Sequence, residues 1–400
     1  MGLLNKIKWL ALRVGKKRKD SGRPDYQIID TESDLKDFAR MLEKEKIVAV
    51  DMEADSLYHF REKVCLLQFA TKWANVIIDP LQIENLAPLK PFFLRSDIKK
   101  VFHGADYDVR SLHRDFDMDI NNLFDTQIAC RFLGLRETGL EAVLQKRFNI
   151  VLDKKYQKKD WSKRPLPKDM LEYAARDAIY LVPLANILED ELEKKGRLSW
   201  VREECDYLSK VRAASPDSHP LYLKFRGAGR LYPRELAVLE GLLQFRKEVA
   251  ERKDRPLFKI FGNDSLIKIA KAKPVNLRQL EKTRSLSRKQ IRMYGNALAE
   301  TVRASLEIPK KNLPAYPRKK GPVLSPKVPE RVKALKRWRD SKAWSLEIEA
   351  GLICNKSLIS TIAIQNPRNI KGLEAIEEMK NWQKEAFGKE IVTVLRKVRR

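Results

Sequence analysis

Cysteine and long apolar runs are scarce in this 400-residue sequence, and their scarcity excludes several classes of protein. The four cysteines are widely scattered and form no Cys-x-x-Cys pair, so neither a disulfide framework nor a cysteine zinc site is expected. No stretch approaches the run of about 18 apolar residues that a membrane span needs. A glycine-rich loop ending in Lys-Ser or Lys-Thr is also missing, which argues against a nucleotide cofactor and an ATP-driven helicase. We therefore expect a cytoplasmic protein, kept in a reducing compartment and without a membrane partner.

Acidic residues are scarce in only one half of the chain. Lys and Arg together number 81 against 54 for Asp and Glu, which gives a net charge of +27. Residues 1–200 hold 36 basic and 32 acidic side chains, whereas residues 201–400 hold 45 and 22. A nearly neutral half joined to a strongly basic half favours chemistry in the first and polyanion binding, above all of nucleic acid, in the second. A role of the charge in solubility alone stays open at this point.

The first half alternates between apolar runs typical of strands and longer helical periods. We expect strands at 47–51, 64–71, 75–80 and 100–103, and helices at 31–46, 105–116 and 167–196. Mixed elements of this kind predict an α/β domain, which we place at residues 25–200. A basic tail, residues 1–24, precedes this domain, and a connector, residues 201–228, follows it.

The second half shows no strand pattern and contains one helical module twice. Three residues of the first copy recur 93 residues later, namely Leu280 as Leu373, Gly295 as Gly388 and Arg303 as Arg396. Asp264-Ser-Leu-Ile matches Lys356-Ser-Leu-Ile at an offset of 92, which calls for a one-residue gap. The nearly constant offset predicts two copies of a helical domain. We place them at residues 229–307 and 330–400, joined by a linker rich in proline and lysine at residues 308–329.

Four acidic residues and one tyrosine stand out because the expected elements would bring them together. Asp51-Met-Glu53 ends an apolar strand, and residues i and i+2 of a strand point to the same face. Alone, this pair is better explained as two surface acids. Asp108, however, falls in the first turn of a helix that follows another strand, and Tyr173 and Asp177 lie four residues apart on one helical face. Carboxylates crowded at the carboxyl end of a sheet are tolerable when divalent cations lie between them.

The order of these motifs resembles that of the DEDD superfamily of 3′–5′ exonucleases, in its tyrosine subtype. Three segments resemble signature segments of the ribonuclease D family: Phe124-Asp-Thr-Gln127, Asp160-Trp-Ser-Lys-Arg-Pro-Leu166 and Leu171-Glu-Tyr-Ala-Ala-Arg-Asp177. The repeated module resembles the helicase-and-RNase-D C-terminal (HRDC) domain, a small helical nucleic-acid-binding fold that bacterial members carry twice. The resemblance implies a ribonuclease-H-like α/β exonuclease domain followed by two all-α HRDC-like domains.

The same resemblance implies a site and a reaction. The catalytic residues would be Asp51, Glu53, Asp108, Tyr173 and Asp177, and the four acids would hold two divalent ions, Mg²⁺ or Mn²⁺, which prefer hard oxygen ligands. Asp51 would bridge both ions, and Tyr173 would orient the attacking water, since a pKa of about 10 makes it a poor base. The expected enzyme is a monomer that releases 5′-nucleoside monophosphates from the 3′ ends of RNA, with tRNA precursors as substrates. Two alternatives stay open: an exonuclease acting on single-stranded DNA, and an inactive RNA-binding protein that keeps the fold.

The residues that would contact RNA are less sharply defined. Arg164 has two interpretations, a phosphate contact or an ion pair with an acid, and the sequence favours neither. In the first helical module Lys268, Lys271, Arg288 and Lys289 are candidates for the RNA backbone, whereas a solvated charged face explains any one of them by itself.

Several neighbouring residues are expected to be structural. Asp106 is interpreted as a first-turn acid, Asp125 as a helix cap and His103 as a packing residue. Aromatic residues of the helical modules, among them Phe258 and Trp382, are expected to be mostly core. The exonuclease site should be self-contained before residue 210, unless the helical modules cover an apolar face of that domain.

Overall fold

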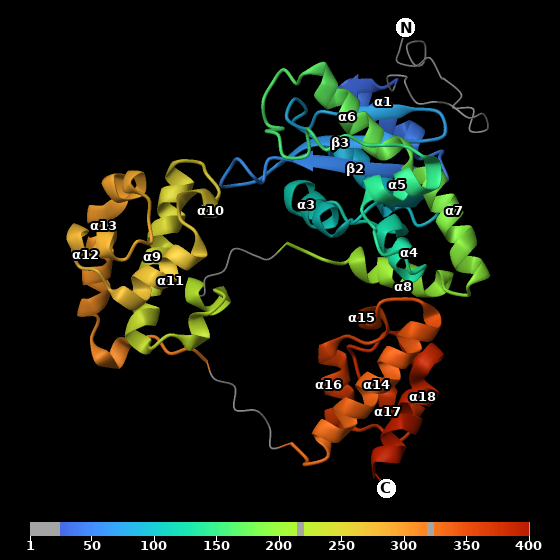
Figure 1. The fold of residues 1–400 in the computed structure, drawn as a ribbon. Helices are drawn as coiled ribbons and strands as arrows, with labels where there is room; N and C mark the ends of the chain where they lie inside the picture. The colour runs from blue at the N-terminus through green and yellow to red at the C-terminus, as the bar shows by residue number, and fades with distance from the viewer. Residues whose placement is uncertain (1–24, 214–219, 318–323, 400) are drawn as a thin grey trace. The chain divides into compact units, whose positions relative to one another are not determined.

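The computed structural model describes residues 25–213, 220–317 and 324–399 (Figure 1). These residues form two compact units. Unit 1 combines the α/β domain with the second helical module, and unit 2 combines the first helical module with residues 55–63. The α/β domain and the helical modules confirm the predicted fold class. None of the helices in the described part of the chain has both the length and the apolar character that a bilayer crossing requires.

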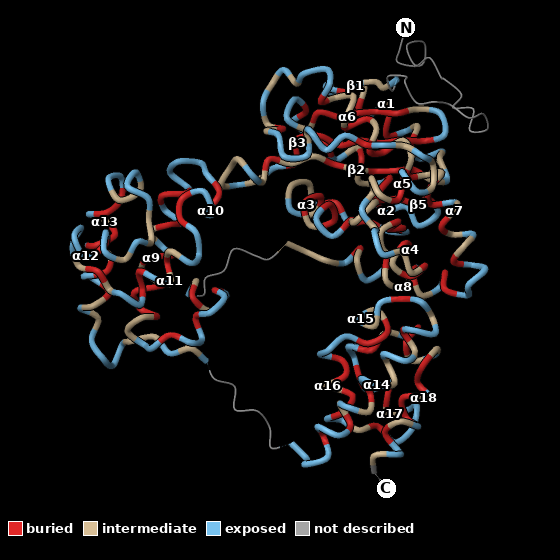
Figure 2. The backbone as a smooth tube through the Cα atoms, in the orientation of Figure 1, coloured by how far each residue is buried: buried red, intermediate tan, exposed pale blue. Residues whose placement is uncertain are grey.

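A six-stranded sheet forms the centre of the α/β domain, with the strands in the order β1-β4-β3-β2-β5-β6. The strands are β1 (Gln27–Ile29), β2 (Ile47–Ala54), β3 (Val64–Ala70), β4 (Asn75–Ile78), β5 (Lys99–Phe102) and β6 (Leu123–Asp125). β2 lies inside the sheet, antiparallel to β3 and parallel to β5. Every residue of β3 and β4 is buried, which explains their nearly unbroken apolar sequences (Figure 2). The edge strands β1 and β6 were not expected, because three residues are too few to show a period.

Helices cover the sheet and continue beyond it. They are α1 (Glu32–Leu42), α2 (Lys90–Leu94), α3 (Asp106–Phe116), α4 (Thr126–Phe132), α5 (Leu140–Phe148), α6 (Lys168–Ile179), α7 (Leu181–Lys194) and α8 (Leu198–Leu208), with a short 3₁₀ turn at Ala87–Leu89. Thr31 caps α1 by accepting a hydrogen bond from the backbone of Asp34 (3.2 Å), as its sequence indicates. The single long helix expected at 167–196 is wrong, because the chain breaks it into α6 and α7 at Tyr180.

The two helical modules repeat the same five helices. The first contains α9 (Pro233–Arg252), α10 (Leu257–Ile260), α11 (Asn263–Ala272), α12 (Leu277–Lys282) and α13 (Arg288–Glu307), with 3₁₀ turns at Leu221–Lys224, Ala228–Arg230 and Lys310–Asn312. The second contains α14 (Val328–Leu346), α15 (Ala350–Ile353), α16 (Lys356–Gln365), α17 (Ile370–Glu374) and α18 (Asn381–Arg399). Both α11 and α16 end at a left-handed residue, Lys273 and Asn366, and start 93 residues apart. The one-residue gap suggested by the Ser-Leu-Ile match is therefore wrong, since the helices align without it.

The second helical module shares its core with the α/β domain. Trp382 of α18 stacks on Trp200 of α8, with ring centroids 4.8 Å apart, and meets Phe132 of α4 edge-on at 5.4 Å. The carboxylate of Glu203 accepts hydrogen bonds from the backbone N–H groups of Asn381 (2.7 Å) and Trp382 (2.8 Å), so α8 caps the first turn of α18. One continuous apolar core thus runs through both parts of unit 1.

Backbone contacts fix the same interface from a second side. Arg197 donates to the carbonyl of Phe132 (2.8 Å) and to that of Leu346 (2.8 Å), and so joins the end of α4 to the end of α14. Gly134 adopts a φ of 85°, and a Cβ there would lie 2.1 Å from the carbonyl oxygen of Glu347. Only glycine fits both the conformation and the approach. The second helical module thus covers an apolar face of the exonuclease domain. This is the case in which, according to the sequence analysis, the exonuclease site should not be self-contained before residue 210.

Unit 2 includes residues 55–63, the loop that joins β2 to β3 in sequence. Its His59 Nδ1 lies 2.6 Å from a carboxylate oxygen of Asp254, and the backbone N–H of Phe60 donates to the other oxygen at 3.0 Å. Arg61 forms an ion pair with Glu251 at 2.8 Å. The carboxyl end of α9 and the second residue after it therefore form the contact face of the first module for this loop.

Candidate active site

The sheet topology brings the carboxylates of β2 and α3 to one edge. Asp51 and Glu53 lie on the same face of β2, and Met52 between them is buried on the opposite face. Because β5 runs parallel to β2, the helix that follows β5 begins where β2 ends. Asp108, 8% exposed, lies in the first turn of that helix.

Asp125 holds the turn that leads into α3. Its carboxylate accepts hydrogen bonds from the backbone N–H groups of Gly104 (3.0 Å) and Ala105 (2.7 Å). The same carboxylate caps α4 by accepting from Gln127 (2.7 Å). The predicted role of Asp125 as a helix cap is confirmed. Its second role, binding the backbone N–H groups of the two residues that precede α3, could not be predicted from the sequence. Asp125 is 1% exposed and therefore positions the approach to Asp108 from inside the domain.

Helix α6 supplies the other two residues of the predicted site. It packs across β2, β3 and β4, and it places Tyr173 one turn before Asp177. The Tyr173 hydroxyl and the Asp177 carboxylate are close enough for each to shift the pKa of the other. Its ring is packed between Tyr156 and Trp161, each with a centroid distance of 6.0 Å. The hydroxyl is thus held by its own helix and by two aromatic neighbours.

The four acids influence one another electrostatically. Burial raises the pKa of Asp51 to about 6. Burial also raises the pKa of Glu53 well above its usual range, and the charges of Asp51, Asp177 and Asp108 raise it further. For Asp108 and Asp177 burial is again the main cause of a raised pKa, and the charge of Asp51 is the next. The charge of Asp51 is among the causes of the raised pKa of each of the other three acids, so the four side chains lie close together.

Crowded carboxylates of this kind fit divalent cations. Oxygen donors alone, with no nearby sulfur or imidazole in the set, suit Mg²⁺ or Mn²⁺ rather than zinc. A cation would relieve the repulsion that raises the four pKa values. Among the described residues, no three His, Cys, Asp or Glu side chains lie close enough together to hold a metal ion as they stand.

Tyr173 has a raised pKa and therefore stays protonated at neutral pH. Burial is the main cause, followed by the charges of Asp177 and Glu53. A protonated phenol beside a carboxylate can orient a water molecule but cannot serve as a general base. The geometry agrees with the orienting role that the family resemblance implies.

Gln68 is a polar residue of the site region that sequence reasoning missed. It pairs in register with Asp51 across β2 and β3, so the two side chains share one face of the sheet. Gln68 is fully buried, and neither its amide oxygen nor its amide nitrogen has a hydrogen-bond partner among the described residues. A polar residue inside the apolar run 64–70 was the available signal.

The guanidinium of Arg164 forms all of its hydrogen bonds within the protein. Its guanidinium binds both carboxylate oxygens of Asp79 at 2.5 and 2.7 Å, and it donates to the backbone carbonyl of Cys65 at 2.9 Å. The remaining N–H groups donate to the carbonyls of Trp161 and Lys163, both at 2.8 Å. All five donors are used, which favours the ion-pair interpretation, and a contact of Arg164 with RNA stays a prediction.

The other neighbouring residues behave as expected. Asp106 is exposed and forms an ion pair with Arg110 at 2.9 Å. His103 lies 2.8 Å from the Thr126 hydroxyl, and burial lowers its pKa, so it packs as a neutral ring.

The predicted RNA-binding lysines and arginines lie on unit 2. Lys268 and Lys271 are exposed on α11, and Arg288 and Lys289 are exposed at the start of α13. None of the four forms an ion pair in the described part of the chain. They stay candidates for phosphate contacts.

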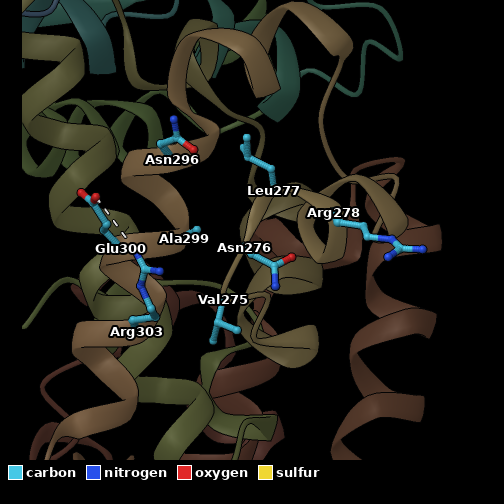
Figure 3. A pocket seen from close by; sticks show the side chains of 8 residues that line it. All are labelled: Val275, Asn276, Leu277, Arg278, Asn296, Ala299, Glu300 and Arg303. Carbon is cyan, nitrogen blue, oxygen red and sulfur yellow. Dashed lines mark ion pairs between the residues drawn. The ribbon is translucent and has the colours of Figure 1, made fainter.

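Unit 2 also contains a pocket of about 520 Å³ between α12 and α13 (Figure 3). Its lining residues are Val275, Asn276, Leu277, Arg278, Asn296, Ala299, Glu300 and Arg303. Arg303 lies 3.9 Å from Glu300, as the dashed line shows. None of the predicted catalytic residues lines it, so it is separate from the acidic site.

Comparison with known proteins agrees with this fold. The 3′–5′ exonuclease domain model matches residues 26–193, and the HRDC domain model matches residues 235–302 and again residues 329–395. The chain is thus a 3′–5′ exonuclease with two HRDC domains. Ribonuclease D of Haemophilus influenzae is 30% identical over 294 residues, 73% of this chain and 73% of that protein. The chain belongs to the ribonuclease D family of 3′–5′ exoribonucleases.

Two solved structures share the architecture. The catalytic core of RRP6 from Trypanosoma brucei matches with a TM-score of 0.62 at 29% identity, over 75% of this chain and 82% of that one. Escherichia coli RNase D matches with a TM-score of 0.70 at 24% identity, over 94% of this chain and 99% of that one. The second match extends the shared fold to the helical modules.

Proposed function

We propose that this enzyme uses two divalent ions to remove nucleotides from the 3′ ends of RNA, as 5′-nucleoside monophosphates. The observation that carries the proposal is the group of four crowded carboxylates from β2, α3 and α6, with Tyr173 beside it. Ions held there would activate water and neutralise the charge that develops on the phosphate during an in-line displacement.

The role of each acid follows from the family resemblance. Asp51 would be shared between both ions, and its charge is among the causes that raise the pKa of Glu53, Asp108 and Asp177. Glu53 and Asp177 would complete the binding of the first ion. Asp108, on a separate helix, would support the second ion through water.

Tyr173 would orient the water that attacks the phosphate. Its protonated hydroxyl is fixed beside Asp177, and the packed ring gives it little freedom to rotate. A group held in this way lowers the barrier by positioning, because the reacting atoms start near the geometry of attack.

Structured RNA, with tRNA precursors as the leading case, is the proposed substrate. The support is the strong positive charge of residues 201–400, which contain 45 basic and 22 acidic residues. Contacts to phosphates position a strand without reading its sequence, which suits an enzyme that trims ends. Single-stranded DNA is the competing substrate, because the acids would act on either phosphodiester. We further propose that the enzyme acts as a monomer, which light scattering would check.

Digestion of matched RNA and DNA strands tests the proposal. The two strands carry the same sequence and a 5′ label, and each is incubated with Mg²⁺, with Mn²⁺ or with EDTA. We expect a ladder of shortened RNA in either metal, mononucleotide products on chromatography and no cleavage in EDTA. A strand blocked by a 3′ phosphate should be shortened more slowly than one with a free 3′ hydroxyl.

Three outcomes separate the alternatives. Cleavage that persists in EDTA contradicts the metal mechanism. Faster digestion of DNA than of RNA moves the substrate to single-stranded DNA. Complete inactivity on both strands, with RNA binding retained, favours the inactive RNA-binding protein. A tRNA precursor with a 3′ extension, compared with the same RNA lacking it, then tests the maturation role.

A further inference from the structure

Trp344 is the most solvent-exposed of the large apolar residues described, with 85% of its surface accessible. It lies in the last turn of α14, the first helix of the second HRDC domain. The opposite face of α14 is buried through Leu335 and Ala343, and the indole N–H of Trp338 donates to Glu390 at 2.8 Å. The helix therefore cannot rotate to bury Trp344, and the ring stays in solvent.

Basic residues share the exposed face of α14 with this ring. Lys333 and Arg337 precede Trp344 by three and two turns, and Lys336 lies beside them. All three are exposed, and none forms an ion pair or side-chain hydrogen bond within the described residues. Two acids share this side of α14: Asp340 is held by Arg339 at 2.7 Å, and Glu330 is exposed in the first turn of the helix. The face thus offers three free cations and one flat aromatic ring.

We propose that this face of α14 binds a single-stranded segment of the RNA substrate, with a base stacked on Trp344 and phosphates beside Lys333, Lys336 and Arg337. Aromatic rings beside basic side chains are the usual platform for unpaired nucleotides, because every base has a stacking face. Arg337 lies two turns, about 11 Å, from Trp344 along the helix, so a strand following the helix could reach both.

Charge and shape favour RNA over a protein partner. A protein interface is built on a patch of apolar residues, whereas Trp344 is the only large apolar residue exposed on α14. Its neighbours are cations rather than further apolar groups.

The position of α14 links this surface to the exonuclease domain. The carbonyl of Leu346, two residues after Trp344, accepts a hydrogen bond from Arg197, which also holds α4. The stacking ring is therefore rigidly attached to the unit that carries the four acids. The inference rests on the proposed function, because it gives the substrate strand a second point of attachment beyond the candidate active site.

Substitution of Trp344 in the full chain tests the proposal. The affinity for a fluorescein-labelled single-stranded RNA of 16 nucleotides is measured by anisotropy in EDTA. Trp344→Ala should weaken binding about 5- to 150-fold, as the loss of one stacked base does, and Trp344→Phe should restore most of it. Arg337→Gln should lower the slope of log affinity against log salt by about 0.7.

Trp73 provides a matched control. It is also an exposed tryptophan, 43% accessible, with Lys72 4.7 Å from its ring centre, but it lies between β3 and β4. Trp73→Ala should leave RNA affinity unchanged. An abasic strand of the same length should bind wild type and Trp344→Ala equally, because it keeps the phosphates and lacks the stacking base. Matching circular dichroism spectra would establish that the Trp344→Ala variant is folded.

The outcomes are distinct. Wild-type affinity of Trp344→Ala for the RNA, or an equal loss on the abasic strand, overturns the proposal. Loss of self-association on light scattering, with RNA affinity unchanged, would assign the surface to a second copy of the chain and also overturn it. Cleavage of a short RNA in Mg²⁺ is measured in parallel. If the wild type cleaves no RNA, the proposed function fails while the binding data still decide the role of Trp344.

Discussion

Replacing Trp382 by alanine should destabilise the exonuclease domain, although Trp382 belongs to the second HRDC domain. The side chain is 2% exposed and contacts Trp200 and Phe132 of the α/β domain. Its indole N–H also donates to the carboxylate of Glu204 at 2.9 Å. The substitution therefore removes a buried ring from a core that both domains share.

The size of the effect follows from these contacts. Replacing a buried tryptophan by alanine costs about 3–5 kcal/mol, and loss of a hydrogen bond to a charged acceptor adds about 1 kcal/mol or more. A reduction of about 4–6 kcal/mol in the free energy of unfolding is a large part of the total stability of a folded protein. At about 2–4 °C for each kcal/mol, the melting temperature of unit 1 should fall by about 10–20 °C.

Calorimetry and residual nuclease activity provide the assay. In wild type, exonuclease activity and the calorimetric transition of unit 1 should be lost at the same temperature, and in Trp382→Ala both should shift together. Trp344→Ala is the matched control, since removal of an exposed ring should change stability by less than about 0.5 kcal/mol. A shift of Trp382→Ala as small as that of Trp344→Ala would refute the shared core. So would nuclease activity that survives the unfolding of the second HRDC domain.

Three further substitutions address the candidate active site. Asp51→Asn should abolish cleavage while RNA binding and melting temperature stay near wild type, and wild-type turnover would remove Asp51 from the site. Tyr173→Phe should lower the single-turnover rate by up to about 10²-fold with metal affinity unchanged, since only a positioned hydroxyl is lost, and an unchanged rate would make Tyr173 a packing residue. Gln68→Leu replaces an unpaired buried amide by an apolar group, so its melting temperature should stay equal or rise while the cleavage rate falls. A lower melting temperature of that variant would show that the amide has a partner in the folded protein.

The acids of the candidate site could be predicted because each lies at a position defined by local pattern. Asp51 and Glu53 end an apolar strand, and Tyr173 and Asp177 are spaced by one helical turn. The strand period therefore places the first pair on one face, and the helix period does the same for the second pair. The fold brings these acids close enough for the charges of the others to raise the pKa of Glu53. Their role as metal ligands stays a prediction, as do the domain boundaries.

Contacts between distant segments could not be predicted. Trp382 was expected in a core, and it is buried, but nothing local indicates that Trp200 is its partner. Phe258 was also expected in a core, but it is 58% exposed, so helical spacing alone does not decide burial. Arg164 was ambiguous because Asp79, its partner, lies on a different part of the sheet domain. For Trp382 and Arg164 the deciding group is far away in sequence.

The turn that follows the first long helix, here called the corner, makes chemically different contacts in the two HRDC domains. Asp254 and Glu347 are equivalent residues, 93 positions apart, and both adopt the left-handed conformation after the first long helix, with φ of 45° and 56°. In unit 2 the corner acts through charge, since the exposed carboxylate of Asp254 binds His59 and the backbone of Phe60. In unit 1 the corner acts through close packing, since Gly134 meets the carbonyl of Glu347 beside the aromatic core. Salt screens exposed charges but not buried packing, so the repeat gives the chain one corner contact that ionic strength can loosen and one that it cannot.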